Sequence, residues 1–360
     1  MSDDESIFED DTSQKEATDD EANLHEGKSP AYGHPDAVCM NWKVPEVFTG
    51  TRADVYLANK VGRLSRVRAR RIIDKGDFRL SNERFLKPST RMREQEVSLW
   101  RLPPDRKEDL KDNVEVLFED DALLVVNKPT DLVVHPSARY LHRTLTYWLR
   151  VRGDGVPVAH PCHRLDRETS GVLVCAKTKE AQRGVKRTFA NQQNQKIYLA
   201  VVQGVGIEKQ SIDLPLALQG WRGLVRIRMI PDDKGLPAQT DVVPLLEDTK
   251  VNRTLIACFP KTGRQHQIRA HCAAIGFPLV GDKLYAFGDE WFDRYTLFSL
   301  TDDDQALVDH PRHALHAFSL RLPFASNETY FAPFPDELRA LLPNEKAHID
   351  DVISDLLSDL

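Results

Sequence analysis

The stretch HRLDRETSG, residues 163–171, places a single carboxylate, Asp166, between Arg164 and Arg167. An arginine next to a carboxyl group typically lowers its pKa by about 1–3 units and keeps it ionised. An ionised carboxylate suits a nucleophile or a general base better than an acid. The alternative is a structural ion pair that caps a turn, and this stretch alone leaves both interpretations open.

The apolar run VLVCA, residues 172–176, follows this charged cluster directly and predicts a buried strand. A loop that enters a buried strand holds its side chains rigidly at the edge of a sheet. Thr169 and Ser170 can satisfy backbone groups of such a loop, and Gly171 lets another chain approach closely. The pattern therefore predicts a carboxylate that a sheet holds in place.

Several other catalytic and metal sites are excluded because their motifs are missing. HRLD is not the kinase order H-R-D, and the chain has no G-x-x-x-x-G-K-[ST] and no G-x-S-x-G motif. The five cysteines are scattered without C-x-x-C spacing, which disfavours a disulfide framework. The Cys/His pairs at 162–163 and 271–272 lack a second ligand pair at the usual spacing, so we expect structural packing and no metal.

Charge is segregated along the 360 residues, although the formal net charge is only −6. Residues 1–26 carry 11 acidic side chains and one lysine, and residues 345–360 carry five acidic side chains and one lysine. The body between them, residues 27–344, therefore has a formal charge of +8. Acidic ends around a basic body suggest a nucleic-acid partner, although the ends themselves can be merely solubilising.

Residues 1–45 are predicted to be a disordered acidic tail, because they lack periodicity and are rich in acidic and small polar residues. Residues 46–104 are predicted to form a small basic RNA-binding domain. Its sequence patterns predict two helices followed by two strands, at 51–62, 65–76, 78–82 and 97–103.

The second predicted helix is basic, with Ser65 as its expected N-cap and Gly76 as its expected C-cap. Residues 51–93 hold 13 Lys or Arg side chains against four Asp or Glu. A charge run is usually a solvated face, but this one has little acid to pair with, which favours contact with RNA or DNA. The residues expected to share overlapping faces for this contact are Arg63, Arg66, Arg70 and Lys75.

Residues 105–113 are predicted to be a polar linker, and residues 114–340 a larger domain. Candidate strands dominate this domain and often follow one another. The fold class is therefore α+β, with a mixed, largely antiparallel central sheet and flanking helices, preceded by a small α/β domain. Residues 341–360 are expected to be an acidic tail or an amphipathic helix. Strands are expected within 114–129 and at 172–176, 196–204, 225–230, 239–247 and 253–259, and helices at 143–153, 179–193 and 266–276.

HRLDRETSG, with the apolar run after it, resembles the catalytic motif of the RluA-like pseudouridine synthases. Other segments resemble further motifs of that family, in the family's order: NKPTDLVVHP (127–136), KIYLAVVQG (196–204), GRQHQIRAHCAAIGFPLVGDKLYA (263–286) and LHAFSLRLPF (315–324). The basic module at 50–102 resembles the small RNA-binding domain named after ribosomal small-subunit protein S-four. The resemblance implies that residues 114–340 are a catalytic domain with the pseudouridine synthase fold.

The resemblance also implies isomerisation of uridine to pseudouridine in RNA, without a cofactor, a metal or a second substrate. Asp166 matches the catalytic aspartate, and Arg164 matches the arginine that helps to displace and replace the flipped base. Tyr198 matches the tyrosine that packs against the uracil, and Arg269 matches the basic residue that pairs with the aspartate. Tyr198 as a core residue and Arg269 as a helix-surface charge are the structural alternatives. Attack by Asp166 on a sugar atom and on a base atom both stay open.

RNA contacts are further expected within the family-like motifs, from Lys128, His135, Arg264 and His266. Some positions depart from the family's usual pattern. Asp131 stands where glycine is common, and Gln265 stands where threonine is common. Ala286 stands where glycine often follows the motif G-D-x-x-Y.

Ribosomal RNA is the expected substrate, with transfer RNA second, because the added module suggests a large structured target. Two other functions stay open. One is a non-catalytic RNA-binding or ribosome-assembly factor. The other is a carboxylate-dependent nucleosidase or glycosidase, which needs a second acid near Asp166. Glu168 is the near candidate.

The acidic N-terminus is unlike a signal or transit peptide. No apolar run approaches the roughly 20 residues that span a bilayer. We therefore expect a cytoplasmic monomer without a membrane partner.

Overall fold

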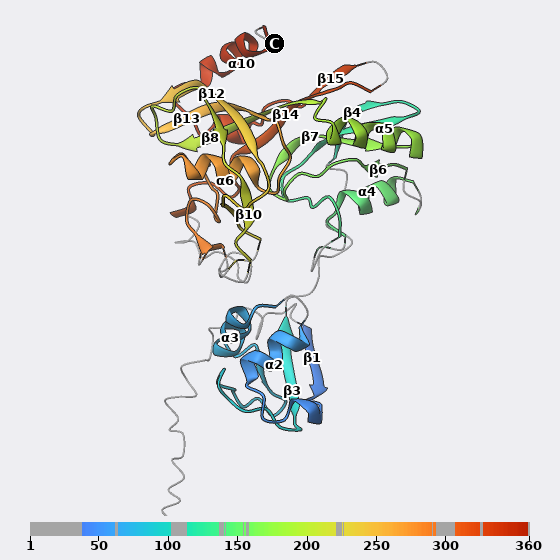
Figure 1. Cartoon of the computed structure of the whole chain (residues 1–360), viewed down its shortest axis with the longest axis vertical. Coiled ribbons are helices and arrows are strands. Elements are labelled where there is room, and N and C mark those ends of the chain that lie inside the picture. The colour runs from blue at the N-terminus through green and yellow to red at the C-terminus, as the bar shows by residue number, and fades with distance from the viewer. Residues whose placement is uncertain are drawn as a thin grey trace, which may run out of the picture. The chain divides into compact units, whose positions relative to one another are not determined.

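The structure is a computed structural model of the chain, and the chain divides into two compact units, Met1–Pro103 and Pro104–Leu360 (Figure 1). The described residues are 38–61, 64–101, 114–136, 140, 142–153, 155, 158–220, 225, 227–289, 291–292, 307–324 and 327–358. The predicted disorder of residues 1–37 and the predicted linker 105–113 lie outside them. Among the described helices, none is long and apolar enough to cross a membrane.

The N-terminal unit is a small sheet packed against two helices. Strands β1 (Val38–Lys43), β3 (Glu96–Arg101) and β2 (Phe78–Leu80) pair in that order, all antiparallel. A short 3-10 helix, η1 (Glu46–Phe48), and helices α2 (Ala53–Lys60) and α3 (Arg66–Asp74) complete the unit. The prediction of disorder up to residue 45 is wrong for residues 38–43, because this segment pairs with β3 along its whole length.

Helix α3 begins and ends as its sequence predicts. The Ser65 hydroxyl accepts a hydrogen bond from the Arg68 backbone N–H, which satisfies one of the free donors of the first turn. The C-cap itself is Lys75, and Gly76 follows it at φ +79°, a left-handed conformation that favours glycine. Ala69 and Ile73 face the core of the unit, so the arginines of the helix lie on its outer side.

The larger unit is built on one mixed sheet whose neighbouring strands follow the order β4-β5-β7-β14-β8-β13-β12-β9. All of these neighbours are antiparallel except β7 and β14, which are parallel. Two further strands pair at the sides, β15 with β14 and β6 with β7. The mixed, largely antiparallel sheet confirms the predicted fold class. The strands are β4 (Glu115–Glu119), β5 (Leu123–Lys128), β6 (His160–Pro161), β7 (Ser170–Ala176), β8 (Gln195–Gln203), β9 (Gln210–Asp213), β12 (Gln239–Asp248), β13 (Arg253–Pro260), β14 (Leu315–Leu322) and β15 (Glu328–Phe331).

Helices cover both faces of this sheet. The helices are α4 (Leu145–Arg152), α5 (Lys179–Ala190), α6 (Gln267–Ala274), α9 (Asp336–Arg339), η4 (Lys346–His348) and α10 (Ile349–Ser358). On β8, Leu199 and Val201 share a core cluster with α10, whereas Ala200 and Val202 share another with α6. Because successive strand residues point to opposite faces, α6 and α10 lie on opposite sides of β8, as Figure 1 shows.

The acidic C-terminal segment is therefore part of the core. Ile349, Ile353 and Leu356 on one side of α10 are buried against the sheet, and its acidic side chains face outward. Of the two alternatives that the sequence left open for residues 341–360, the amphipathic helix is the one observed. Leu341 and Leu342 are buried in the same cluster, so the packed core extends beyond the predicted boundary at residue 340.

One predicted strand is much shorter than its sequence suggests. Of the described residues in the predicted strand 225–230, only Met229 and Ile230 lie in a strand, β11 (Met229–Pro231). It pairs with β10 (Leu216–Leu218) in a separate two-stranded sheet. The alternation of apolar and basic residues in VRIRMI imitates a strand pattern. The Arg228 side chain instead pairs with Asp289 at 2.7 Å.

Gly171 is where the strand β7 meets the strand β14. It pairs in parallel with Ala317, which lies far along the chain. Its φ is +112°, and a Cβ at this position would overlap the Ala317 carbonyl group. The prediction that Gly171 lets another chain approach closely is confirmed, and that chain is β14.

We predict that Gly171→Ala destabilises the larger unit. The added methyl group meets backbone rather than a movable side chain, so the free energy of unfolding should fall by about 1–3 kcal/mol from overpacking, and further from the left-handed φ. Urea unfolding measures the loss. Gly206→Ala is the matched control, because Gly206 also has a positive φ, +81°, with open space around it. Equal losses for the two variants would contradict the close-packing explanation.

Candidate active site

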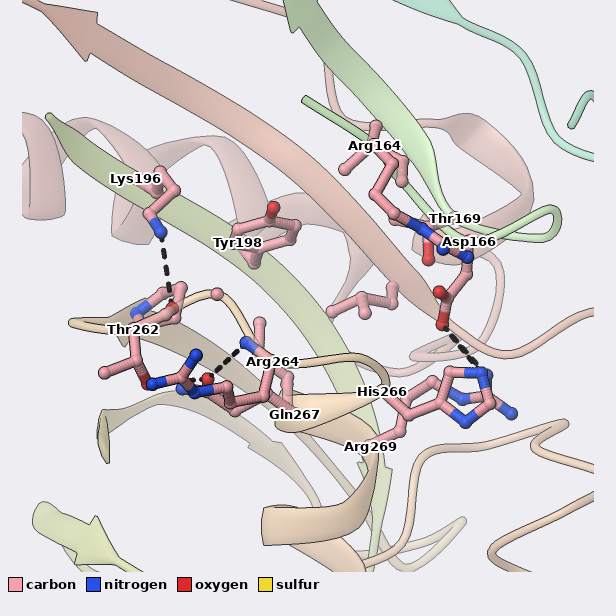
Figure 2. Close-up of a pocket in the computed structure, with 15 residues that line it drawn as sticks. Arg164, Asp166, Thr169, Lys196, Tyr198, Thr262, Arg264, His266, Gln267 and Arg269 are labelled. Atoms are coloured by element: carbon pink, nitrogen blue, oxygen red, sulfur yellow. Dashed lines mark hydrogen bonds and ion pairs between the residues drawn. The ribbon is translucent and has the colours of Figure 1, made fainter. Parts of the chain in front are cut away.

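The four residues with predicted catalytic roles line one pocket in the larger unit. Asp166 and Arg164 lie on the loop before β7, Tyr198 lies on β8, and Arg269 lies on α6. The pocket contains about 480 Å³ of empty space, part of it open to solvent. Figure 2 shows these side chains arranged around it, with the Asp166–Arg269 contact on one side and Lys196 on the other. Residues that the sequence places far apart are thus brought together by the sheet and α6.

Arg269 links Asp166 to a second carboxylate, Asp282. Its Nη1 donates to Asp166 Oδ2 at 2.9 Å, while its Nε and Nη2 donate to the two oxygens of Asp282 at 2.7 and 2.9 Å. The Asp282 side chain is fully buried, and its Oδ1 also accepts the backbone N–H groups of Leu284 and Tyr285. A bidentate contact of this kind holds a guanidinium in one orientation. Arg269 is therefore fixed from behind and aimed at Asp166.

The surroundings of Asp166 keep it ionised. Burial by itself raises the pKa of a carboxyl group, but the positive charges of His266, when protonated, and of Arg269 outweigh it, so the pKa of Asp166 lies well below its usual range. Burial also lowers the pKa of His266, to about 4, so at neutral pH the stabilising charge comes from Arg269. Among the described residues, none donates a hydrogen bond to Asp166 Oδ1. One carboxylate oxygen is thus held and the other is available for chemistry.

His266 is the other polar neighbour of this carboxylate, with its Nε2 3.9 Å from Asp166 Oδ2. The Tyr285 hydroxyl accepts the Met229 backbone N–H at 2.9 Å, so its own proton is free to go to His266 Nδ1, 3.2 Å away. This arrangement favours the neutral tautomer that carries its proton on Nε2, toward Asp166. The Arg269 guanidinium carbon lies over the Tyr285 ring, 5.1 Å from the ring centroid. Tyr285 therefore contacts both neighbours of Asp166, namely His266 and Arg269.

Tyr198 and Arg164 form the parts of the pocket that can meet a base. Tyr198 is half-buried, and burial together with the negative charge of Asp166 raises the pKa of its hydroxyl, which therefore stays protonated at neutral pH. Arg164 is exposed, and its side chain makes no hydrogen bond or ion pair with any described residue. A protonated aromatic platform and an uncommitted arginine suit stacking and displacement of a base.

Behind Asp166, a buried polar network holds the loop 166–170 to the segment before β14. Glu168 receives Lys283 Nζ at 3.1 Å and the His313 backbone N–H at 3.0 Å. Arg312 donates to the Glu168 carbonyl oxygen and to the Ser170 hydroxyl, both at 3.1 Å. The Thr169 hydroxyl lies 2.8 Å from His313 Nε2. The hydroxyls of Thr169 and Ser170 therefore bond side chains from another segment rather than the loop backbone that the sequence suggested.

This network also decides the role of Glu168. Burial raises the pKa of its carboxyl group, but His313, Lys283 and Arg167 outweigh that effect and hold the pKa well below its usual range. Glu168 is therefore ionised and committed to structural contacts. It does not meet the requirement of the nucleosidase hypothesis for a protonated second acid.

The structure does not support the prediction that Lys128 contacts RNA. The Lys128 side chain is fully buried, and its Nζ donates to the backbone carbonyls of Pro129, Leu132 and Arg167 at 2.8, 2.9 and 3.1 Å. All three ammonium protons are used in this way. Lys128 instead ties the strand β5 to the loop that carries Asp166.

The other predicted RNA-contacting residues of this unit lie at or near the pocket. Arg264 and His266 line the pocket itself. His135 is exposed, and partial burial together with the positive charges of Arg164 and Lys186 lowers its pKa. Gln265, one of the departures from the family pattern, donates to the Ile227 carbonyl at 3.3 Å.

Asp131, the first departure from the family pattern, has a φ of +62°. Glycine adopts this conformation freely, and Asp is among the few other residues that tolerate it, which explains the substitution. Its carboxylate pairs with Arg143 at 2.7 Å and with Arg167 at 3.4 Å. The turn is therefore kept, and the aspartate adds a contact to the loop that carries Asp166.

In the N-terminal unit, the predicted RNA-contacting residues Arg66, Arg70 and Lys75 all belong to α3 or its C-cap. Arg66 pairs with the buried Asp54 at 3.0 Å, and Arg70 pairs with Asp74 at 3.7 Å. The side chains of Arg66 and Arg70 remain mostly exposed, at 60% and 65%. Arg63 lies outside the described residues. RNA contact by this helix stays a prediction.

Sequence reasoning missed Asp282, Tyr285 and Lys196 as parts of the site. Asp282 and Tyr285 belong to GDKLYA, which was matched to the family only as a segment, and Lys196 is the first residue of KIYLAVVQG. The signal for Asp282 was available: a buried arginine needs counter-charges, and this acid follows it closely in the chain. No such signal marked Tyr285. Among the described residues, no three potential metal ligands lie together.

Comparison with known proteins agrees with this geometry. Residues 122–274 match the family model described as RNA pseudouridylate synthase. A protein of Zymomonas mobilis named ribosomal large subunit pseudouridine synthase D is 33% identical over 312 residues, which cover 82% of this chain and 94% of that protein. The chain belongs to the RNA pseudouridine synthase family. It is therefore an RNA pseudouridine synthase, an enzyme that isomerises uridine in RNA.

Other relatives agree on the family. The protein of the same name from Nitrosomonas europaea is 38% identical over 235 residues, and the match spans 64% of either chain. The solved structure of human RNA pseudouridylate synthase domain containing 1 aligns with a TM-score of 0.50 and 29% identity, covering 66% of this chain and 89% of that one. The fold of the larger unit is thus that of the pseudouridine synthases.

We predict that removing the Arg269 charge moves the acid limb of the pH–rate profile upward. Arg269 holds the pKa of Asp166 down, so without it burial dominates and the pKa should rise by about 1–3 units. We expect the ionised form to be the active one, so activity should be lost at higher pH as the solution is acidified. The variant is Arg269→Met with Asp282→Asn, which leaves no unpaired buried charge at Asp282.

Single-turnover isomerisation measured across pH tests this expectation. Asp282→Asn alone is the matched control, because it leaves Arg269 beside Asp166 and should keep the acid limb low. A double variant with the wild-type pH profile would remove Arg269 from the control of Asp166.

Proposed function

We propose that this synthase isomerises specific uridines in structured RNA, with ribosomal RNA as the substrate and transfer RNA as the second candidate. The relatives named ribosomal large subunit pseudouridine synthases support this choice. The basic α3 of the N-terminal unit supports it as well, since a second RNA-contacting surface suits a large folded target.

Asp166 is the proposed catalytic residue, and the observation that carries the proposal is its ion pair with Arg269 at the edge of a pocket walled by Tyr198. The target base is flipped out of the RNA at a cost of a few kcal/mol. Stacking on Tyr198 offsets part of this cost, by about 1–3 kcal/mol in single-strand recognition. Arg164, exposed at the pocket, is placed to fill the space that the base leaves in the RNA.

The isomerisation is balanced without any other reactant. The bond between N1 of uracil and C1′ of the ribose breaks, and its electron pair stays with the base. The base turns over, a bond forms between C5 and C1′, C5 loses its proton and N1 gains one. The ionised Asp166 serves as the nucleophile or base in this sequence, whether it acts on the sugar or on the base. Arg269 holds it charged and aimed.

A non-catalytic RNA-binding factor on the same scaffold is the weaker alternative. The Asp166–Arg269–Asp282 arrangement is complete, and burying one arginine between two carboxylates is expensive to maintain without a use. Release of free uracil, which a nucleosidase would give, is the outcome that separates that class from an isomerase.

Asp166→Asn should abolish isomerisation while leaving RNA affinity nearly unchanged. The amide keeps the shape of the side chain but is a very poor nucleophile and base. Pseudouridine formation and RNA binding are measured with a folded ribosomal RNA fragment and with transfer RNA, after mapping pseudouridines in cells with and without the gene. Asp336→Asn, an exposed aspartate, is the control. Appreciable pseudouridine formation by Asp166→Asn would overturn the assignment.

The N-terminal unit should contribute RNA affinity rather than chemistry. Arg70→Gln with Lys75→Gln removes two positive charges of the α3 region, so RNA binding should weaken and its salt dependence should flatten by about one unit of slope per lost phosphate contact. Turnover at saturating RNA should be kept. Lys209→Gln, an exposed lysine of the larger unit, is the control. Unchanged binding with lost turnover would contradict this division of roles.

A further inference from the structure

Lys196 is a pocket residue to which neither the fold nor the Asp166 chemistry gives a role. It lies on β8 two residues before Tyr198, so the two side chains share the face of the strand that α6 covers. Residues two apart in a strand are separated by about 6.6 Å. A uracil ring stacked on Tyr198 would therefore lie within reach of the Lys196 ammonium. Figure 2 shows Lys196 on the opposite side of Tyr198 from Asp166.

Among the residues that the structure describes, none provides a counter-ion for the Lys196 ammonium. Its Nζ donates to the Thr262 carbonyl at 3.3 Å, which uses one of three protons, and no described carboxylate lies within ion-pair distance of it. Burial lowers its pKa to about 8, so it is still mostly charged at neutral pH. A desolvated charge without a partner is costly, and this cost points to a ligand that brings the negative charge with it.

The reaction itself produces a negative charge at this place. When the N1–C1′ bond breaks, the electron pair left on the base is delocalised onto the oxygens at C2 and C4. If Asp166 adds to C6 of the base instead, the electron pair of the C5–C6 double bond moves onto the C4 carbonyl oxygen, which becomes an enolate. Both routes that remain open for Asp166 thus place negative charge on a uracil oxygen, at the far end of the ring from the ribose or along its edge.

We propose that Lys196 is a catalytic residue that donates a hydrogen bond to a carbonyl oxygen of the flipped uracil and stabilises the negative charge on the base. It transfers no proton, because the charge is transient and is removed when N1 is protonated. This inference rests on the proposed isomerase function. It assigns a second cation to the site: Arg269 acts on the enzyme's carboxylate, and Lys196 acts on the base.

A phosphate of the RNA backbone is the competing occupant. Arg264 is the better placed residue for that role, since it lines the pocket and its guanidinium commits only its Nε, in an exposed hydrogen bond to the Pro237 carbonyl. The Lys196 contact with the Thr262 carbonyl is, in contrast, part-buried, and Lys196 lies on the same strand face as the base platform. The two occupants differ in what they predict: a phosphate contact strengthens RNA binding, whereas charge stabilisation on the base speeds the chemical step.

The experiment compares Lys196→Met, Lys196→Arg and the control Lys261→Met in single turnover with saturating RNA. Lys261 is a neighbouring exposed lysine that pairs with Asp241 at 3.0 Å. Loss of one donor to a developing oxyanion typically slows the chemical step by about 100- to 1,000-fold, and we expect this of Lys196→Met with little change in Kd for RNA. Lys196→Arg should recover most of the rate, and Lys261→Met should behave as wild type.

Thermal unfolding confirms that Lys196→Met is folded, which is expected because methionine fits an apolar wall of similar volume. Sulfur substitution in the substrate identifies which oxygen Lys196 contacts, because sulfur is a weaker hydrogen-bond acceptor than oxygen. RNA is prepared with 4-thiouridine or with 2-thiouridine at the target position. For one of these two RNAs the wild-type chemical step should slow, whereas the Lys196→Met chemical step should slow no further.

A weaker Kd with a flatter salt dependence and an unchanged rate would show a phosphate contact and overturn the proposal. Equal effects of both thio substitutions on wild type and Lys196→Met would overturn it too. A wild-type enzyme that forms no pseudouridine would refute the proposed function itself, which Asp166→Asn tests separately.

Discussion

Everything at this site depends on one arginine shared between two carboxylates. Arg269 is almost completely buried, and in that position it needs negative partners on both sides. Asp282 holds it through two hydrogen bonds, and Asp166 receives the remaining part of its charge. The Asp166 carboxylate is thus kept ionised by a cation that Asp282 holds in place. Because burial alone would raise the pKa of Asp166, its ionisation depends on this neighbour.

The second constraint is the position of β14 in the middle of the sheet. It separates β7 from β8, the two strands that carry Asp166 on its entry loop and Tyr198. The segment before β14 supplies Arg312 and His313, which clamp the loop from behind. The distance between carboxylate and tyrosine is therefore set by a strand that contributes no catalytic side chain. Gly171 is required there because its backbone touches that strand directly.

Sequence reasoning identified the residues that face the pocket better than those that support it. Asp166, Tyr198 and Arg269 were identified because their motifs resemble those of a known family, and buried strands such as β7 follow from unbroken apolar runs. Lys128 was predicted to contact RNA because a lysine in an Asn-Lys-Pro sequence suggests an exposed side chain. In the structure its ammonium is buried and donates to three backbone carbonyls.

The hydrogen-bond partners of a buried charged side chain depend on the folded chain and cannot be deduced from the local sequence pattern. The same holds for Asp282, which becomes meaningful only once α6 has placed Arg269 beside it. Local pattern also has limits for whole elements. It predicted a strand longer than β11, and it left open whether residues 341–360 form a tail or the helix α10. Burial of Ile349 and Ile353 against the sheet settles the second of these.

The central place of β14 has a consequence for biosynthesis. A ribosome makes β7 and β8 long before residues 315–322, and pairing between strands so distant in sequence is slow. While the chain is still being translated, the gap between β7 and β8 stays unfilled, and the carboxylate and the tyrosine are not yet spaced for chemistry. The spacing of Asp166 and Tyr198 seen in the structure can therefore arise only after β14 has been synthesised.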